Sequence, residues 1–402
     1  MGLKGDQHTS RALNRRLILN LLRRNAAMSR VDIAAQTGLS SAAVTFVTTD
    51  LMAEGLIIEG EASRGGGGRR PVPLSINYTS RLAIGIKLSA TGLQASLCDL
   101  STRALATLTE PIPDTRPETV VRHAAKIVQG LLAHPLTGQA EVIGIGLALP
   151  GSYDVDRGVC TFMARFGWEA VPIADMLAQL VDLPVWVDND VNAFALAQYL
   201  FGRGQNHRNM MAMVIGTGVA AAFITDGVLH RGARGAAGEI GHVNVVPDGR
   251  PCLCGRRGCL ETYWSDCALR SDWAAHVAAH PSAEPDLLLA ANHKDAAAQA
   301  LLRAAGIGLG TTLAAVVGMI DPDLIIVGGK GARYTEHLRA PMQTRLNALA
   351  YKSRPEIHFE WDHDSWPRCA AALVLQKFFD FEVREGIQKP DQNLDLRSQQ
   401  SG

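Results

Sequence analysis

One short segment of the chain carries the residues and the spacing of a metal site. Within Gly235–Glu261, one histidine and three cysteines follow the pattern H-x9-C-x-C-x4-C, at His242, Cys252, Cys254 and Cys259. Structural zinc sites take four such ligands in a tetrahedron, with every position supplied by the protein. The segment therefore predicts a structural zinc site, and Gly255 and Gly258 allow the tight turns that it needs.

The same cysteines are open to other interpretations, namely chance spacing, a disulfide pair or free thiols. The chain has seven cysteines, an odd number, and Met1–Ser10 is polar where a signal peptide would have an apolar core. We therefore expect a reducing, cytoplasmic compartment, in which metal ligands are favoured over disulfides. The isolated cysteines are expected to be small core residues: Cys98, Cys160, Cys267 and Cys369.

Composition indicates a globular protein of two or three domains, because 47% of the 402 residues are hydrophobic and 19% are charged. Lys plus Arg and Asp plus Glu both number 39, but residues 1–78 carry ten basic and six acidic residues. This local surplus favours a small nucleic-acid-binding module, although a solvated basic helix would give the same count. The longest apolar runs, such as Val142–Pro150 and Thr312–Ile320, are shorter than the roughly 20 residues that cross a bilayer, so no membrane insertion is expected.

The first 78 residues have the pattern of a winged helix-turn-helix domain that binds double-stranded operator DNA. Helical periodicity begins near Leu13, Ser29 is a plausible N-cap, Gly38 permits a sharp turn, and Ser40 caps a third helix through about Glu54. The helix after the turn lies in the major groove in this motif. The residues expected to meet base edges are Ser41, Ala42 and Thr45, with Thr48 and Thr49 further along.

A wing is predicted after the third helix. Residues 56–76 read as two short strands around Gly65–Gly68, and the narrow minor groove attracts basic side chains such as Arg64, Arg69 and Arg70. Two alternatives are open: the glycines are a flexible linker, or the three helices form a protein-interaction domain.

From residue 79 the pattern is that of an α/β domain. Strands are predicted at 82–88, 93–100, 142–149, 184–188 and 210–215, with helices at about 117–133 and 298–318. Polar residues follow several of these strands, which is where α/β sheets bind ligands. We expect two lobes that face one cleft, at about 79–188 and 189–384, and a disordered polar tail at 385–402.

Several motifs, in this order, resemble the ROK family of sugar kinases and repressors over residues 80–380: Asn189-Asp190-x-Asn192, Gly216-Thr217-Gly218, Gly238-Glu239-Ile-Gly-His242, Cys-x-Cys-Gly-x-x-Gly-Cys-Leu-Glu261 and Asp321-Pro-Asp to Gly328-Gly329. With the N-terminal module, the chain looks like the ROK repressors, relatives of the xylose, glucose and N-acetylglucosamine regulators. The resemblance implies a two-lobed, actin-like (ribonuclease H-like) sugar-kinase fold.

The resemblance also implies a sugar site. In ROK kinases the Asp of the Asn-Asp motif deprotonates a sugar hydroxyl, a role that here would leave Asp190 as a vestigial base. The implied sugar-binding residues are Asn189, Asp190, Glu239, His242 and Glu261. Carboxylates and imidazole suit polyols because each bonds one or two hydroxyls. As structural alternatives, Glu239 caps a helix, or Asp190 is the N-cap of the helix that follows it.

The nucleotide side departs from the kinase pattern. Where ROK kinases resemble Asp-x-Gly-Gly-Thr, this chain has Lys87-Leu-Ser89-Ala-Thr91, and Gly216-Thr217-Gly218 continues as Val-Ala-Ala-Ala222. Phosphoryl transfer depends on metal and phosphate positioning, so the sequence predicts an inactive, kinase-like sensor. An active ROK sugar kinase with a regulatory domain, and a repressor titrated by a sugar-transport protein, are the alternatives.

The expected mechanism is a homodimer or tetramer in which a sugar or sugar phosphate favours one lobe arrangement and thereby changes the spacing of the DNA-binding modules. A ligand shifts such an equilibrium only by its differential affinity for the two states. His242 is the expected link, with one ring nitrogen on zinc and the other free for a sugar hydroxyl.

Overall fold

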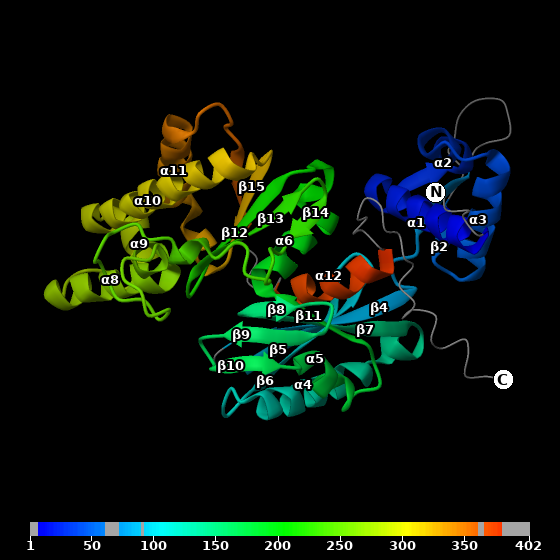
Figure 1. Ribbon diagram of the computed structural model, residues 1–402, viewed down its shortest axis with the longest axis horizontal. Helices are drawn as coiled ribbons and strands as arrows, with labels where there is room; N and C mark the ends of the chain where they lie inside the picture. The colour runs from blue at the N-terminus through cyan, green and yellow to red at the C-terminus, as the bar shows by residue number, and fades with distance from the viewer. Residues whose placement is uncertain (1–6, 61–71, 90–91, 361–365, 380–402) are drawn as a thin grey trace.

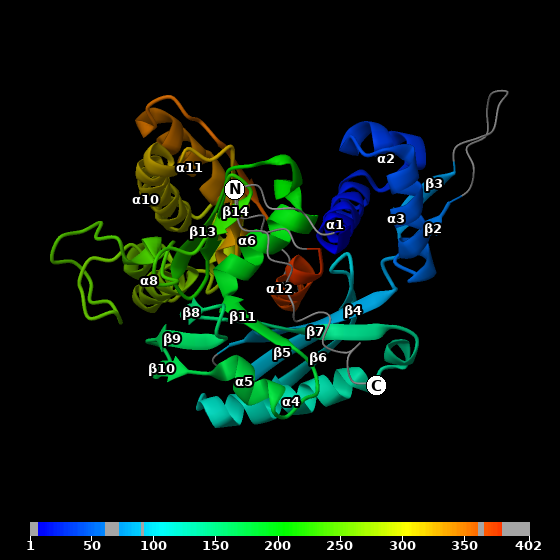
Figure 2. The ribbon, with the colours of Figure 1, turned by 45° about the vertical axis from the view of Figure 1, so that its right-hand side comes forward.

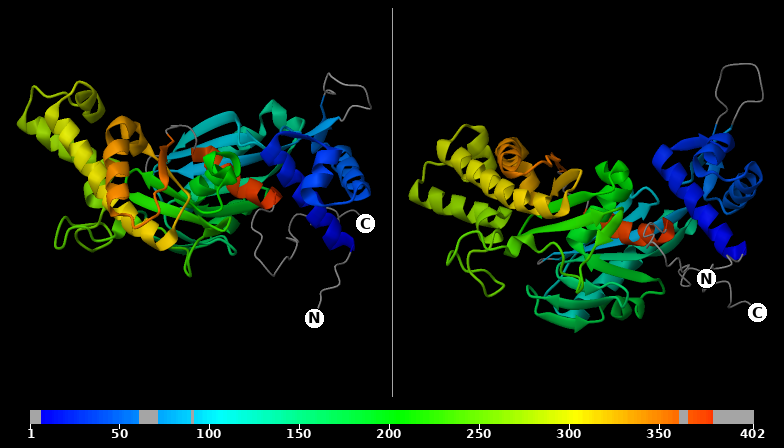
Figure 3. Two further views of the ribbon diagram at one scale, coloured as in Figure 1. Left: turned by 90° about the horizontal axis from the view of Figure 1, so that it is seen from above. Right: turned by 45° about the horizontal axis from the view of Figure 1, so that its top comes forward.

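The computed structural model describes residues 7–60, 72–89, 92–360 and 366–379 (Figure 1). The predicted wing arginines Arg64, Arg69 and Arg70, the pair Ala90-Thr91 and the tail at 385–402 lie outside these ranges. Three parts follow one another along the molecule. The N-terminal module lies at one end, a first lobe is next to it, and the helices of the second lobe form the other end (Figure 3).

The N-terminal module has the predicted three helices and the strand pair of a winged helix-turn-helix. A capping box between Ser29 and Asp32 begins the second helix, and the Ser40 side chain accepts a hydrogen bond from Ala43 N to begin the third. Gly38 makes the turn between them with a φ of 70°. The elements are α1 (Gln7–Asn25), β1 (Ala27–Ser29), α2 (Arg30–Thr37), α3 (Ser41–Ala53), β2 (Ile57–Glu59) and β3 (Pro73–Ile76), with sheet order β1-β3-β2.

The two lobes have sheets of the same design, in which three parallel strands continue into an antiparallel pair. The first sheet has the order β11-β7-β4-β5-β6. Its strands are β4 (Arg81–Leu88), β5 (Gly92–Asp99), β6 (Ala104–Pro111), β7 (Glu141–Leu149) and β11 (Val185–Asn189). The second has the order β14-β13-β12-β15-β16. Its strands are β12 (Met210–Ile215), β13 (Val219–Thr225), β14 (Val228–His230), β15 (Leu324–Gly328) and β16 (Glu356–Phe359).

Helices cover the outer faces of both sheets. The first lobe has α4 (Pro117–Leu132), α5 (Ile173–Ala178) and a small sheet of β8 (Ser152–Asp154), β9 (Val159–Met163) and β10 (Trp168–Val171). The second lobe has α7 (Glu261–Trp264), α8 (Asp266–Ala279), α9 (Leu287–Asn292), α10 (Ala296–Ile320) and α11 (Thr335–Leu349). By length and composition, α10 is apolar and long enough to cross a membrane, but it packs against α9 and α11 and contributes to the core of this lobe.

Two helices fill the space between the sheets. The helix α6 (Asp190–Phe201) packs on β12 and β13, and α12 (Trp366–Phe379) packs on β4 and β7 and against α6. Two glycines bring α12 onto the first sheet, because a Cβ on Gly85 would lie 1.8 Å from Pro367 O and one on Gly146 would lie 1.9 Å from Ala370 O. The expected lobe boundary places α12 in the second lobe by chain order, whereas in space this helix covers the first sheet.

The N-terminal module is packed against this central pair of helices. Figure 2 shows α12 between the first sheet and α1. Leu22 of α1, Ala83 of β4 and Val374 of α12 belong to one buried apolar cluster. Asn20 Nδ2 donates a hydrogen bond to Phe379 O at 3.0 Å. The N-terminal module therefore shares a core with the lobe that follows it.

Candidate functional site

The predicted zinc ligands lie together. The ligand atoms of His242, Cys252, Cys254 and Cys259 all lie within 4.8 Å of one another. Cys254 Sγ is 3.7 Å from Cys259 Sγ, and Cys252 Sγ is 3.6 Å from His242 Nδ1. A tetrahedron with Zn–S bonds of about 2.3 Å has S···S edges of about 3.8 Å, so these four side chains fit a zinc ion.

The loop that carries the cysteines depends on two left-handed glycines. Gly255 and Gly258 have φ values of 84° and 76°. A Cβ on Gly258 would also lie 1.8 Å from Val246 O. None of the seven cysteines forms a disulfide. Cys98, Cys160 and Cys369 are buried as expected, but Cys267, the second residue of α8, is exposed, so its assignment to the core was wrong.

Two further glycines place Glu239 and His242 beside the three cysteines. A Cβ on Gly238 would lie 1.8 Å from Ala221 O, and one on Gly241 would lie 2.0 Å from Val219 O. The segment that contains Glu239 and His242 can therefore lie directly on β13. Across from it, a Cβ on Gly218 would lie 2.4 Å from Glu261 Oε2, so the Gly216-Thr217-Gly218 loop leaves space for this carboxylate.

The imidazole of His242 lies between two carboxylates. Its Nδ1 is 3.5 Å from Glu261 Oε1, and its Nε2 is 3.8 Å from Glu239 Oε2. Burial raises the pKa of Glu239, the charges of Glu261 and Asp190 raise it further, and His242 opposes them. Because Nδ1 of His242 faces the cysteines, its Nε2 is directed away from them and toward Glu239.

The Asn-Asp motif lies where β11 ends and α6 begins. Asn189 is the N-cap of α6, because its Oδ1 accepts from Val191 N at 2.8 Å, while its Nδ2 donates to Gly151 O at 2.8 Å. The alternative role of Asp190 as N-cap is therefore wrong, since Asp190 is the first helical residue. Glu239 makes no side-chain cap bond either. Both polar ends of Asn189 have intramolecular partners, whereas Asp190, Glu239, His242 and Glu261 form one cluster.

Asp190 has a partner that motif matching did not indicate. Lys87 Nζ, at the end of β4, donates to Asp190 Oδ2. The two side chains are 15% and 19% exposed, and Lys87 Nζ also lies 5.2 Å from the centroid of the Trp366 ring. The sequence shows the unusual lysine at position 87, but it does not show that the ammonium group pairs with Asp190.

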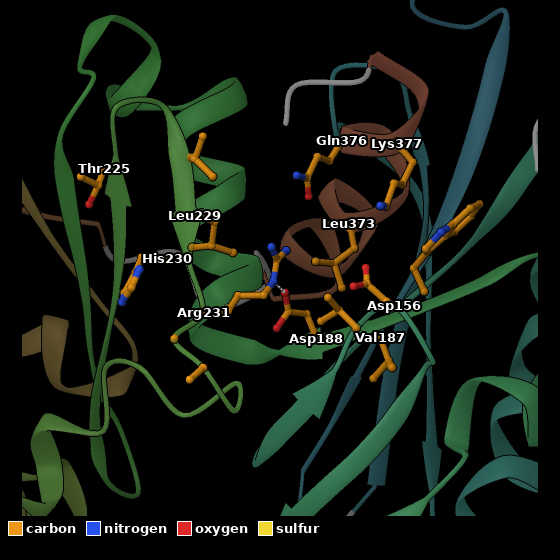
Figure 4. A pocket seen from close by; sticks show the side chains of 15 residues that line it. Asp156, Val187, Asp188, Thr225, Leu229, His230, Arg231, Leu373, Gln376 and Lys377 are labelled. Carbon is orange, nitrogen blue, oxygen red and sulfur yellow. Dashed lines mark hydrogen bonds and ion pairs between the residues drawn. The ribbon is translucent and has the colours of Figure 1, made fainter. Parts of the chain in front are cut away.

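A second ion pair joins the lobes behind this site. Arg231 Nε, which follows β14, donates to Asp188 Oδ2 of β11 at 2.8 Å, and Asn192 Nδ2 donates to Asp188 Oδ1 at 2.8 Å. Figure 4 shows this pair in a cavity of about 360 Å³ between β11, β14 and α12. Sequence reasoning missed Arg231, because no motif marks it.

One helix connects the polar site with the DNA-binding module. The first residue of α6 is Asp190, and near its other end Leu200 O accepts a hydrogen bond from Arg23 Nη1 of α1. Arg23 is only 7% exposed, burial lowers its pKa to about 10, and its Cζ lies 5.7 Å from the Phe201 ring centroid. The two ends of α6 therefore lie at the polar site and against α1.

The predicted DNA-contacting face is exposed, with one exception. Ser41, Ala42, Thr45 and Thr49 are exposed on α3. Thr48 is fully buried, and its Oγ1 accepts from Arg30 Nε at 3.2 Å, so its placement among the base contacts was wrong. The helical period decides this, since Thr48 is on the face of Val44 and Leu51, which pack into the core.

Comparisons with known proteins agree with both parts of the chain. The ROK family model matches residues 83–373, and a winged helix-turn-helix DNA-binding model matches residues 11–58. The N-acetylglucosamine repressor of Escherichia coli O157:H7 is 28% identical over 373 residues, which cover 90% of this chain and 92% of the relative. The xylose repressor of Bacillus subtilis is 27% identical over 322 residues, with 80% and 83% covered.

Solved structures include both regulators and kinases. A ROK family transcriptional regulator, described as a homolog of the E. coli MLC protein, has a TM-score of 0.80 at 25% identity and covers 92% of this chain and 97% of that one. A ROK family glucokinase from Streptomyces griseus, in complex with glucose and AMPPNP, has a TM-score of 0.63 at 29% identity, with 72% and 98% covered. The kinase match covers 72% of this chain, whereas the regulator match covers 92% of it. The chain belongs to the ROK family and joins a winged helix-turn-helix DNA-binding module to a two-lobed, actin-like sugar-kinase fold.

Proposed function

We propose that this protein is a transcriptional repressor that binds operator DNA as a homodimer or tetramer in the cytoplasm and is released by a sugar or sugar phosphate. The observation that carries the proposal is the Lys87–Asp190 ion pair inside a ROK sugar site that is joined to a DNA-binding module. The module supplies the DNA contact. The ion pair occupies the carboxylate that a kinase uses as its base.

The sugar site in this proposal is the wall of Asp190, Glu239, His242 and Glu261, with Asn189 shaping it as the N-cap of α6. The carboxylates accept hydrogen bonds from sugar hydroxyls, and His242 Nε2 faces Glu239 on the side away from the cysteines. Zinc on His242, Cys252, Cys254 and Cys259 would fix the imidazole tautomer and so the donor presented to the sugar. The metal therefore has a structural role.

The protein is proposed to be a sensor without kinase activity. Transfer of a phosphoryl group needs a base that accepts the sugar hydroxyl proton and cations that position the phosphates. Here the carboxylate of Asp190 is paired with Lys87 Nζ, and this lysine replaces the acidic residue that the resemblance to ROK kinases implies at the end of β4. A sugar hydroxyl competes with Lys87 for the carboxylate of Asp190. Sugar binding therefore changes the contact that holds the start of α6.

We infer that α6 transmits this consequence to the DNA-binding module. Its first residue is in the sugar site and its last turn accepts the hydrogen bond from the buried Arg23. The helix has twelve residues and is about 18 Å long, and it reaches from Asp190 in the proposed sugar site to the contact with Arg23. The ion pair of Arg231 and Asp188 also joins the two lobes, so a change in the angle between the lobes would act on this contact.

The test is a panel of hexoses, pentoses, amino sugars and their phosphates, scored by melting temperature and by release of the full-length protein from its own promoter. We expect one sugar class to raise the melting temperature and to release DNA, because a ligand bound to the folded state stabilises it by mass action. If every sugar fails in both assays and a sugar-transport subunit releases the DNA instead, the sugar-sensor proposal is wrong. Sustained sugar-dependent ATP turnover that is lost in Asp190→Ala would show an active kinase.

A further inference from the structure

We propose that α3 recognises thymine methyl groups in the operator, with Phe46 as the central contact. This inference rests on the proposed function, since it names what the DNA-binding face reads. Phe46 is 55% exposed although it is a large apolar residue. It shares one face of α3 with Ala42, Thr45 and Thr49, because positions three, four and seven apart lie on the same side of a helix.

The exposed face lacks the groups that pair with purine edges. Arg and Lys bind guanine and Asn and Gln bind adenine in the major groove, but α3 (SAAVTFVTTDLMA) contains none of these four residue types. The threonine hydroxyl hydrogens are already used within the helix, since Thr45 Oγ1 donates to Ser41 O and Thr49 Oγ1 donates to Thr45 O, each at 2.8 Å. Methyl groups, acceptor oxygens, the Ser41 hydroxyl and the Phe46 ring remain available for contact with a base.

Neighbouring charges support a DNA-facing position for the ring. Asp50 lies on the same edge of α3 and would repel phosphate, but Arg11 Nη2 is paired with it. Arg11 Cζ also lies 4.9 Å from the centroid of the Phe46 ring. The guanidinium therefore neutralises Asp50 and holds the ring in place while leaving more than half of the Phe46 surface open.

Thymine is the base whose chemistry matches this face. The thymine C5 methyl is the apolar group that the four bases present in the major groove, where the other recognition atoms are nitrogen and oxygen. Ser41, Ala42, Thr45, Phe46, Thr49 and Asp50 line a shallow depression on α3 that a row of base edges can approach. An apolar contact here buries the methyl and the ring together, and it selects thymine over cytosine at the same position.

The experiment begins with selection of binding sites from a random duplex library by the full-length protein. Each selected thymine is then replaced in turn by deoxyuridine, which lacks only the methyl group. Burial of one methyl-sized group contributes about 0.8 kcal/mol, so we expect about fourfold weaker binding for each contacted thymine. Phe46→Ala should bind the thymine and deoxyuridine duplexes with equal affinity at the position that faces residue 46.

A matched control is Val31→Ala, which removes an apolar side chain that is 73% exposed on α2 of the same module. This variant should keep the full penalty for deoxyuridine. Binding of random-sequence duplex should be the same for wild type and Phe46→Ala, because phosphate contacts carry that affinity. Unchanged melting temperatures would show that both variants fold.

The outcomes separate the inference from the proposed function. If no sequence is enriched from the library, the protein is not a sequence-specific regulator and both proposals are wrong. If sites are enriched but deoxyuridine changes the affinity at no position, DNA recognition stands and the thymine inference is overturned. A deoxyuridine penalty that persists in Phe46→Ala also overturns it, because another residue then contacts the methyl.

Discussion

Lys87 Nζ donates a hydrogen bond to Asp190 Oδ2, and this single contact joins the end of β4 to the first residue of α6. Lys87 is the penultimate residue of β4, where the resemblance to ROK kinases implies an acidic residue, and Asp190 is the residue that the same resemblance places at their base position. Both side chains are mostly buried, so the attraction between them offsets part of the cost of removing each charge from water. The pair therefore holds the start of α6 against the first sheet.

Loss of the lysine should destabilise the fold. In Lys87→Met, Asp190 is left without its cation beside Glu239 and Glu261, and we expect the free energy of unfolding to fall by about 1–3 kcal/mol. Urea denaturation monitored by fluorescence measures this change. Lys126→Met removes the lysine of an exposed pair with Glu110 and should change the stability little. Equal effects of the two substitutions would contradict a special role for Lys87.

Loss of zinc should weaken repression and the sugar response together. We expect one zinc per chain by elemental analysis of the purified protein, and loss of zinc in Cys254→Ser, since a structural site needs all four ligands. Repression and induction in a reporter strain should both weaken. Cys267→Ser is the matched control, because Cys267 is an exposed thiol outside the cluster. Wild-type induction by a zinc-free Cys254→Ser protein would remove zinc from the mechanism.

Arg23 should be needed for communication and not for sugar binding. Arg23→Met removes the donor to Leu200 O and keeps most of the apolar volume. We expect the sugar to bind with nearly unchanged affinity while the sugar-dependent loss of DNA affinity shrinks severalfold, since coupling between sites is commonly about 1–3 kcal/mol. Calorimetry with sugar and DNA binding with and without sugar measure the two quantities. The neighbouring Arg24→Met is the control, and full coupling in Arg23→Met would rule out the α6 route.

Kinase activity should be absent. A coupled assay with ATP, magnesium and the sugar panel should show no sustained turnover, because the carboxylate at the base position is paired with Lys87. The S. griseus type of ROK glucokinase is a suitable positive control for the assay conditions. Turnover that disappears in Asp190→Ala would show that the ion pair opens and that the base still works.

Local patterns in the sequence determined the parts of the protein that depend on near neighbours. The capping box of Ser29 and Asp32, the Gly38 turn and the zinc spacing of Cys252 to Cys259 are all built within a few residues. Strand periodicity likewise predicted β4, β5, β7 and β12 nearly to the residue. The same local logic failed at Thr48, which was named beside Thr49 although it lies on the buried face of α3.

Only the tertiary structure decided which distant residues meet. Lys87 and Asp190 are 103 residues apart, and Arg23 and Leu200 are 177 apart. Such pairs depend on strand order and on how closely helices approach a sheet, as at Gly85 and Gly146, where the absence of a Cβ admits α12. Periodicity and caps carry no information about these distances. The family and the His/Cys cluster could therefore be predicted from the sequence, whereas the Lys87–Asp190 pair and the contact between α6 and the N-terminal module required the folded chain.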